Sequence, residues 1–298
     1  MEQLRMTRCL NCMKEYQEKE GACPYCGGVE NRAPNTLKEG SIIDGRYLAG
    51  AIRCQGEKDF WYIGWDTLFH RRVLIMEYFP RELALREAGG AVKAQKSHKE
   101  TFAIELDNFI KESRQLITLD DTPGLLNVLA VTEDQGTAYV IMEYPEGTIL
   151  QKLLQEQDIC PPEQVQWLVQ ELSGPIAAAH RRGVVHGQIN AERIFVLPDG
   201  DCLIGGFYGS LAGKDFKTGV EADIMSLAGL AGSMLTGRVR WKEHSFEENL
   251  QYLRQFVPEC VTDALRAALG EERDRRPGSM RRFADLFLDE ATIEMYSE

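Results

Sequence analysis

The order of hydrophobic and polar residues divides the chain into an earlier part that favours strands and a later part that favours helices. Three segments, residues 60–65, 73–79 and 137–144, are rich in β-branched and aromatic residues, which predicts strands. Between the second and the third segment, hydrophobic residues from Phe102 to Ile117 recur at helical spacing, which predicts one amphipathic helix.

Beyond Gly147 the hydrophobic spacing becomes mostly helical. Hydrophobic residues at helical spacing predict one helix over residues 165–179, and residues 224–235 are predicted to form another. A short strand pair is predicted at residues 193–206, where a Pro-Asp-Gly sequence forms the turn. We therefore expect an α+β architecture, with a small sheet-rich lobe joined to a larger helical lobe.

The same pattern suggests three regions along the chain. Residues 1–31 form a cysteine-bearing unit that is too small to own a hydrophobic core. Residues 32–41 are polar and are interpreted as a linker. From residue 42 to residue 291 the hydrophobic pattern is continuous enough for one domain, with an N-lobe over about 42–144 and a C-lobe over about 145–291.

Composition narrows the class of protein. The chain has 298 residues, and 34 lysines and arginines against 46 aspartates and glutamates give a net charge of -12. This acidity argues against a nucleic acid or an anionic membrane as a partner, because both require a basic surface. The sequence has neither a long hydrophobic run nor the hydrophobic core of a signal peptide, so we expect a cytoplasmic protein.

Four cysteines near the N-terminus have the spacing of a metal site. They form two Cys-x-x-Cys pairs, Cys9 with Cys12 and Cys23 with Cys26. Such spacing predicts a four-thiolate zinc site with no open coordination position, hence a structural ribbon. Two alternatives stay open, namely unligated thiols and a ribbon that touches nucleic acid.

Five segments of the chain resemble a known family when they are taken in order. They resemble segments of bacterial serine/threonine protein kinases of the eukaryotic-like type, including those with a zinc ribbon ahead of the kinase domain. In this chain the five segments are residues 46–80, 137–150, 180–196, 222–237 and 272–283. The resemblance implies a two-lobed protein-kinase-like fold, preceded here by the small four-cysteine zinc ribbon.

The resemblance also places unusual residues at the reactive positions. Met76 stands where the family has the lysine of its VAIK strand, and Gln188 stands where it has the catalytic base. The two positions of the metal ligands hold Arg193 and Gly206. Phosphoryl transfer depends on positioned charge, so we expect none of these four residues to perform the family's role. Glu112 resembles the partner of the missing lysine, but we interpret it as an ordinary surface glutamate.

The nucleotide-facing positions differ from the family as well. The glycines of the phosphate loop fall at Cys54, Gly56 and Asp59, so one glycine is kept. The residues that would surround adenine are all larger than the family's, and we expect them to fill that space: Trp61, Leu74 and Phe195. The resemblance thus implies that neither ATP nor magnesium is bound.

Other matching residues are those that support the fold. The DFG-like triplet falls at Gly206-Phe207-Tyr208, and Asp223 matches the aspartate that anchors the catalytic-loop backbone. The remaining matches are His186 and Leu116 in a hydrophobic column and Arg276 with Pro277 near the end of the C-lobe.

These residues lead to one functional expectation and two alternatives. We expect a pseudokinase that is not an enzyme and that acts as an interaction or regulatory scaffold for an unidentified protein partner. The alternatives are a serine/threonine kinase with weak or atypical ATP-dependent activity that uses displaced residues, and a nucleotide sensor without transfer.

Overall fold

The chain folds into two compact units, each described here by itself. The computed structural model describes residues 6–17, 22–28, 33–119, 122–207 and 216–288. Tyr208, the last residue of the DFG-like triplet, lies outside the described residues. The first unit spans Met1–Asp120 and Asn127–Tyr144, and the second spans Asp121–Leu126 and Pro145–Glu298.

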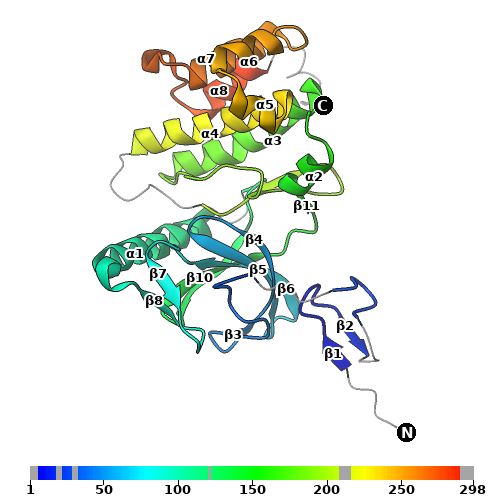
Figure 1. Ribbon diagram of the computed structural model, residues 1–298, viewed down its shortest axis with the longest axis vertical. Coiled ribbons are helices and arrows are strands. Elements are labelled where there is room, and N and C mark those ends of the chain that lie inside the picture. The colour runs from blue at the N-terminus through cyan, green and yellow to red at the C-terminus, as the bar shows by residue number, and fades with distance from the viewer. Residues whose placement is uncertain (1–5, 18–21, 29–32, 120–121, 208–215, 289–298) are drawn as a thin grey trace. The chain divides into compact units, whose positions relative to one another are not determined.

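Unit 1 is built on a six-stranded antiparallel sheet (Figure 1). Nearly every residue of its central strands is buried. In spatial order the strands are β3 (Ile42–Ile43), β4 (Tyr47–Gln55), β5 (Asp59–Asp66), β6 (Arg71–Tyr78), β10 (Thr137–Glu143) and β9 (Val128–Asp134).

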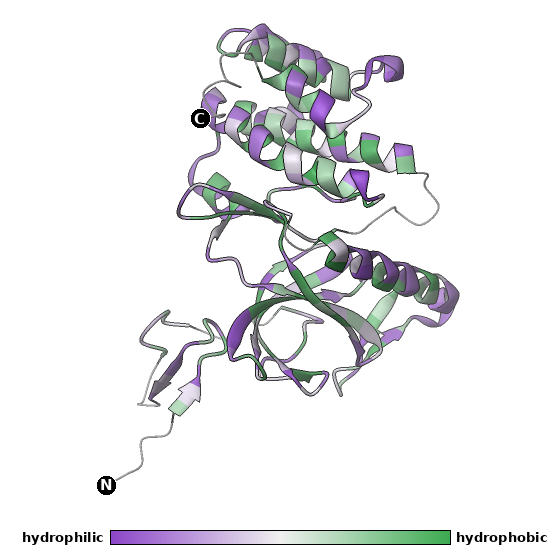
Figure 2. Ribbon diagram, turned by 180° about the vertical axis from the view of Figure 1, so that it is seen from behind, coloured by the Kyte–Doolittle hydropathy of each residue, from purple (hydrophilic) through white to green (hydrophobic). Residues whose placement is uncertain are grey.

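Helix α1 (Lys99–Leu116) packs against β9 and β10 through one hydrophobic side. Figure 2 shows its turns in both hydrophilic and hydrophobic colours, as expected of an amphipathic helix. Short 3-10 turns flank it at Lys96–His98 and Ile117–Leu119. A hairpin of β7 (Ala84–Arg86) and β8 (Val92–Ala94) forms a separate two-stranded sheet.

The N-terminal cysteine region also belongs to unit 1. Strands β1 (Met6–Arg8) and β2 (Glu15–Gln17) pair as an antiparallel hairpin. The turn between them carries Cys9 and Cys12. The boundaries that we assigned to a ribbon, a linker and a kinase-like domain stay predictions.

Unit 2 is mainly helical (Figure 1). Its longest helices, α3 (Pro162–Arg181) and α4 (Phe216–Thr236), pack against each other. A three-stranded sheet is formed by β11 (Thr148–Ile149), β12 (Ile194–Val196) and β13 (Cys202–Ile204). The remaining elements are α2 (Leu150–Glu156), α5 (Arg238–Glu243), α6 (Phe246–Leu253), α7 (Glu259–Leu269), a 3-10 turn at Arg273–Arg275 and α8 (Met280–Phe287).

The order of elements confirms the expectation of strands first and helices later. Each of the three strands expected between residues 60 and 144 is present, as β5, β6 and β10. The helices expected at 102–117, 165–179 and 224–235 are α1, α3 and α4. Within the described ranges, no helix is long and hydrophobic enough to cross a membrane.

Candidate functional site

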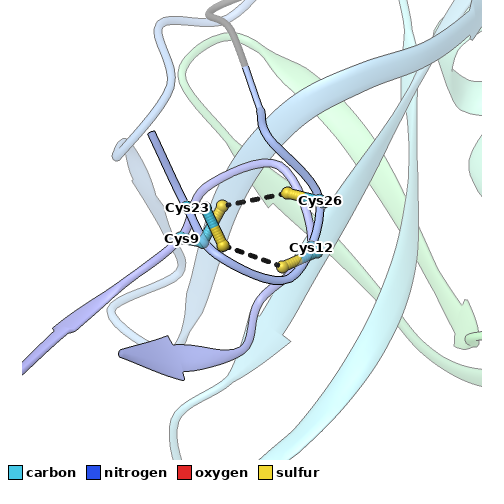
Figure 3. A group of neighbouring side chains, drawn as sticks. All are labelled: Cys9, Cys12, Cys23 and Cys26. Atoms are coloured by element: carbon cyan, nitrogen blue, oxygen red, sulfur yellow. Dashed lines mark hydrogen bonds between the residues drawn. The ribbon is translucent and has the colours of Figure 1, made fainter. Parts of the chain in front are cut away.

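The four cysteines of the N-terminal region lie together, although ten residues separate the two pairs. Figure 3 shows their side chains converging on one point. All four Sγ atoms lie within 4.8 Å of one another. The Sγ atoms of Cys9 and Cys26 are 3.6 Å apart, and those of Cys12 and Cys23 are 3.8 Å apart.

These distances fit a metal ion of the zinc type. A tetrahedron with metal–sulfur bonds of about 2.3 Å has sulfurs about 3.8 Å apart. Burial raises the pKa of the Cys9 thiol and raises that of Cys12 to about 12. A bound divalent cation acts in the opposite direction, because it stabilises the thiolate form. The cluster is therefore compatible with zinc.

In unit 1 the residues expected to face a nucleotide lie in one row across the sheet. Trp61 of β5 is paired with Met76 of β6, and the next pair on the same side joins Ile63 to Leu74. Alternate residues of a strand face the same side, so Trp61, Leu74 and Met76 share one face. Their exposed fractions are 0%, 1% and 0%, so a thioether is buried where the family has an ammonium group.

The loop between β4 and β5 is closed by its own aspartate. The Gly56 amide donates to the Oδ1 atom of Asp59 at 3.0 Å and to its backbone carbonyl at 3.0 Å. Asp59 is fully buried, and Cys54 is half-buried at the end of β4. A phosphate-binding loop would offer such a backbone amide to an anion, whereas here the Gly56 amide is bonded within the loop.

A lysine–glutamate ion pair joins this loop to helix α1. The Nζ atom of Lys58 lies 2.9 Å from an Oε atom of Glu105. The same carboxylate accepts a 2.9 Å hydrogen bond from the Tyr78 hydroxyl at the end of β6. The pair lines a hollow of about 390 Å³, and the two side chains are 35% and 21% exposed.

This pair was not predicted from the sequence. The family pattern places the lysine at position 76 of β6 and its partner at Glu112, which is half-buried on α1. The available signal was a lysine two residues after the one retained glycine, Gly56. The pairing depends on the packing of α1 against the sheet, which spacing along the chain does not show.

In unit 2, Asp223 of α4 holds the loop that contains Gln188. One carboxylate oxygen accepts from the His186 amide and the other from the Gly187 amide, both at 2.7 Å. The Nε2 atom of His180 lies 2.8 Å from the first of these oxygens. Asp223 is fully buried, so these contacts satisfy a carboxylate that has no access to water.

The same loop brings Gln188 and Arg193 together. Arg193 is 1% exposed, and its Nη2 atom donates to the Oε1 atom of Gln188 at 3.1 Å. Its backbone carbonyl accepts from the Gly205 amide at 3.1 Å. Gly206 follows with a φ of 77°, in the left-handed region that favours glycine. A guanidinium group has no lone pair for a metal, and Gly206 has no side chain, so these positions do not fit magnesium.

His186 is held as a neutral ring beside this loop. Its Nε2 atom donates to the Gly205 carbonyl at 3.1 Å, and its Nδ1 atom accepts from the Gln188 amide at 3.2 Å. The ring packs on Phe207 with centroids 4.4 Å apart. Burial lowers the pKa of His186 to about 4, although the negative charge of Asp223 favours the protonated ring. The contact with Phe207 supports aligning the DFG-like triplet at Gly206.

Phe195, the third residue expected to fill the adenine space, lies on β12 of unit 2 and is 4% exposed. The structure therefore brings Trp61 and Leu74 together within unit 1 and places Phe195 in the other unit. The seven positions singled out around the nucleotide are thus divided between the two units. Three lie on the sheet face of unit 1, namely Trp61, Leu74 and Met76, and four lie in unit 2, namely Gln188, Arg193, Phe195 and Gly206.

Comparison with known proteins identifies the fold. A family model described as "Protein tyrosine and serine/threonine kinase" matches residues 83–212. The solved structure described as "PpkA-294 apo form" has a TM-score of 0.66 and 22% sequence identity, covering 85% of this chain and 100% of that one. The chain therefore has a kinase-like fold and is a protein-kinase-like protein.

Among the relatives are bacterial serine/threonine kinases. "Serine/threonine-protein kinase PknL" of Mycobacterium tuberculosis is 30% identical over 169 residues, which are 57% of this chain and 38% of that protein. "Probable serine/threonine-protein kinase CPE1738" of Clostridium perfringens is 28% identical over 92 residues, 31% of this chain and 13% of that protein. The match to PknL thus spans well under half of the length of that protein.

One expectation from the sequence is wrong. We expected a protein that is not an enzyme, because Met76, Gln188, Arg193 and Gly206 replace the reactive residues. The kinase family model and the relatives named as serine/threonine kinases point instead to an enzyme. Phosphoryl transfer consists largely of positioning and charge stabilisation, so loss of the usual side chains does not by itself exclude transfer supported by others.

Proposed function

We propose that this chain is a serine/threonine-kinase-like enzyme with weak, atypical ATP-dependent activity that relies on a displaced lysine. In such a step, an acceptor hydroxyl oxygen attacks the γ-phosphorus. The bond from that phosphorus to the oxygen of ADP breaks, and the hydroxyl proton leaves to solvent. Support comes from the kinase-like fold and from the relatives named as serine/threonine kinases.

The observation that carries this proposal is the ion pair between Lys58 and Glu105. In the kinase family, one lysine contacts the ATP phosphates and pairs with a glutamate of the helix that packs on the sheet. Here the pair reaches α1 from the loop after Gly56 at 2.9 Å rather than from β6. Both side chains are partly exposed and line a hollow of about 390 Å³, which supports placing an anionic ligand beside them.

The activity that we propose is weak for two physical reasons. Each lost electrostatic contact typically costs on the order of 3 kcal/mol of transition-state stabilisation, or a hundredfold in rate, and the losses need not add. In addition, Trp61 and Leu74 are larger than the family residues, so they narrow the space for adenine. We therefore expect millimolar rather than micromolar affinity for ATP. Magnesium takes no part in the proposed step, because Arg193 and Gly206 offer it no ligand.

We also propose that Cys9, Cys12, Cys23 and Cys26 hold one structural zinc ion. The sulfur–sulfur distances of 3.6 and 3.8 Å support this assignment. A site closed by four thiolates supplies a cross-link between two chain segments and no Lewis-acid chemistry.

The partner that we propose is a protein, which supplies the acceptor hydroxyl. The net charge of -12 disfavours nucleic acids and anionic membranes. It favours a protein surface with basic residues around the acceptor, and hence an association that weakens with salt.

The proposal predicts that ATP stabilises the folded chain through Lys58. At ten times its dissociation constant, a ligand adds about 1.4 kcal/mol of stability, which raises the melting temperature by a few degrees. We expect this rise on titration with ATP, with or without magnesium, and its loss in Lys58→Met. Lys93→Met is the matched control, because Lys93 and its partner Glu87 are both exposed. An unchanged melting temperature in the wild type, or an equal rise in Lys58→Met, would contradict the proposal.

A further inference from the structure

The turn that carries Cys9 and Cys12 is hydrogen-bonded to strand β4. The Ala51 amide of β4 donates to the carbonyl oxygen of Leu10, which lies between Cys9 and Cys12, at 2.8 Å. Strand β3 pairs with β4 only near its start, at Tyr47 and Leu48. The first cysteine turn therefore supplies a partner to the part of this edge that β3 does not reach.

The turn and the strand approach each other very closely. A Cβ atom at Gly50 would overlap both the Leu10 carbonyl and the end of the Met13 side chain. Met13 is 1% exposed, so its side chain is buried within unit 1. Glycine at position 50 is what allows this approach. The cysteine turn is thus packed into unit 1 and is not a freely tethered appendage.

One arginine of β4 connects the strand to the sulfur cluster through Asn11. The Nη1 atom of Arg53 donates to the side-chain oxygen of Asn11 at 3.0 Å, and its Nη2 atom donates to the Asn11 carbonyl. Asn11 in turn points its own donors at the cluster. Its amide lies 3.4 Å from the Sγ atom of Cys9, and its Nδ2 atom lies 3.6 Å from that of Cys26.

The charges favour this arrangement when a metal is bound. Four thiolates and one zinc ion carry a net charge of minus two. Donors directed at the sulfurs and a nearby cation stabilise that charge, as outer-shell groups of metal sites commonly do. The guanidinium group of Arg53 offers a planar fork of donors. Asn11 thus contacts both Arg53 and the sulfurs.

We propose that Asn11 and Arg53 transmit metal occupancy at the four-cysteine cluster to strand β4, so that bound zinc orders β4 and the loop that follows it. The inference rests on the zinc site proposed above and is independent of phosphoryl transfer. Its reciprocal is that β4 strengthens metal binding, because a coupling between two sites acts equally in both directions. Asn11 and Arg53 are positioning residues in this scheme, since neither is a ligand.

The test is amide hydrogen exchange of the full chain, read in the peptide that covers residues 48–56. Removal of zinc with a chelator should raise exchange there by about tenfold, since local opening becomes easier. Arg53→Met should raise exchange in the same peptide while zinc remains bound, and its zinc affinity in competition with a chromophoric chelator should fall about 10- to 100-fold. Arg53→Lys keeps the charge but loses the fork, so we expect an intermediate effect.

Three controls separate the possible failures. Arg114→Met removes an exposed arginine that pairs with Glu133 at 3.5 Å, and it should change neither exchange at 48–56 nor zinc affinity. Metal analysis of the wild type reports on the site itself, and absence of zinc would overturn both the site and the link. Melting curves show whether each variant is folded. If the wild type contains zinc and each variant is folded, the link alone would be overturned by either of two results. One is unchanged amide exchange at residues 48–56 after chelation of the wild type, and the other is unchanged exchange there in Arg53→Met.

Discussion

At the scale of single residues, His186 contacts the loop around Gln188 as an uncharged ring. Its ring donates to the Gly205 carbonyl from one nitrogen and accepts from the Gln188 amide at the other. Protonation would place a hydrogen where the Gln188 amide now donates. It would also bury a cation near Arg193, which opposes the attraction of Asp223. The neutral ring is therefore part of the folded structure.

This arrangement predicts that unit 2 loses stability in mild acid. The pKa of His186 falls from 6.5 to about 4 on folding. Below pH 6.5 the His186 ring binds a proton in the unfolded chain but not in the folded chain. The free energy of unfolding therefore falls as the pH drops from about 6.5 to about 4. The full effect is on the order of 3 kcal/mol.

Urea unfolding as a function of pH measures this effect. His186→Asn should remove this part of the pH dependence, while His70→Asn, at an exposed histidine with a φ of 51° that asparagine tolerates, should not. Equal pH profiles for the wild type and His186→Asn would contradict the assignment.

At the scale of elements, a buried ion pair fixes the β7–β8 hairpin to the sheet. Arg86 of β7 lies 2.6 Å from the carboxylate of Glu77 on β6, which is fully buried. The Glu77 carboxylate also accepts from the Tyr62 hydroxyl at 2.8 Å and the Tyr139 hydroxyl at 3.0 Å. Burial and this carboxylate raise the pKa of both tyrosines, so their hydroxyls remain donors.

We predict that Arg86→Met destabilises unit 1 by about 3 to 5 kcal/mol, because it leaves a buried carboxylate without its cation. Urea unfolding of the full chain followed by tryptophan fluorescence measures the change, with Lys93→Met on the same hairpin as the control. Adding Glu77→Gln to Arg86→Met should recover part of the loss, since it removes the uncompensated charge. A loss below about 1 kcal/mol, typical of an exposed pair, would contradict the prediction.

The elements that the sequence predicted best are those with strong hydrophobic patterns. The segments at 60–65, 73–79 and 137–144 gave β5, β6 and β10, since their β-branched and aromatic residues fit buried strands. The β7–β8 hairpin was not predicted, because its position depends on the contact between Arg86 and Glu77 rather than on periodicity.

The same limit applies to the candidate site. Spacing predicted that the four cysteines would gather, and their sulfurs lie within 4.8 Å of one another. It could not predict that the turn would pack on Gly50 and Arg53, which are about 40 residues further along the chain. Nor could it predict the pair of Lys58 and Glu105, since their contact depends on the packing of α1.

At the scale of the whole molecule, the departures from the kinase family occur in both units. Unit 1 carries Met76 on the sheet face, and unit 2 carries Gln188, Arg193 and Gly206 around one loop. The supporting framework is present in each unit by itself, as the sheet with α1 in unit 1 and as the Asp223 anchor in unit 2. The proposed transfer relies on this framework, although the reactive side chains differ.

The most direct test of this account is transfer of labelled γ-phosphate from ATP to a serine-rich basic protein by the full chain under single-turnover conditions. We predict slow transfer above that of heat-denatured protein, a loss of at least about tenfold in Lys58→Met, and little change in Lys93→Met, which removes an exposed lysine paired with Glu87. No transfer by the wild type, or transfer by Lys58→Met at the wild-type rate, would contradict the account.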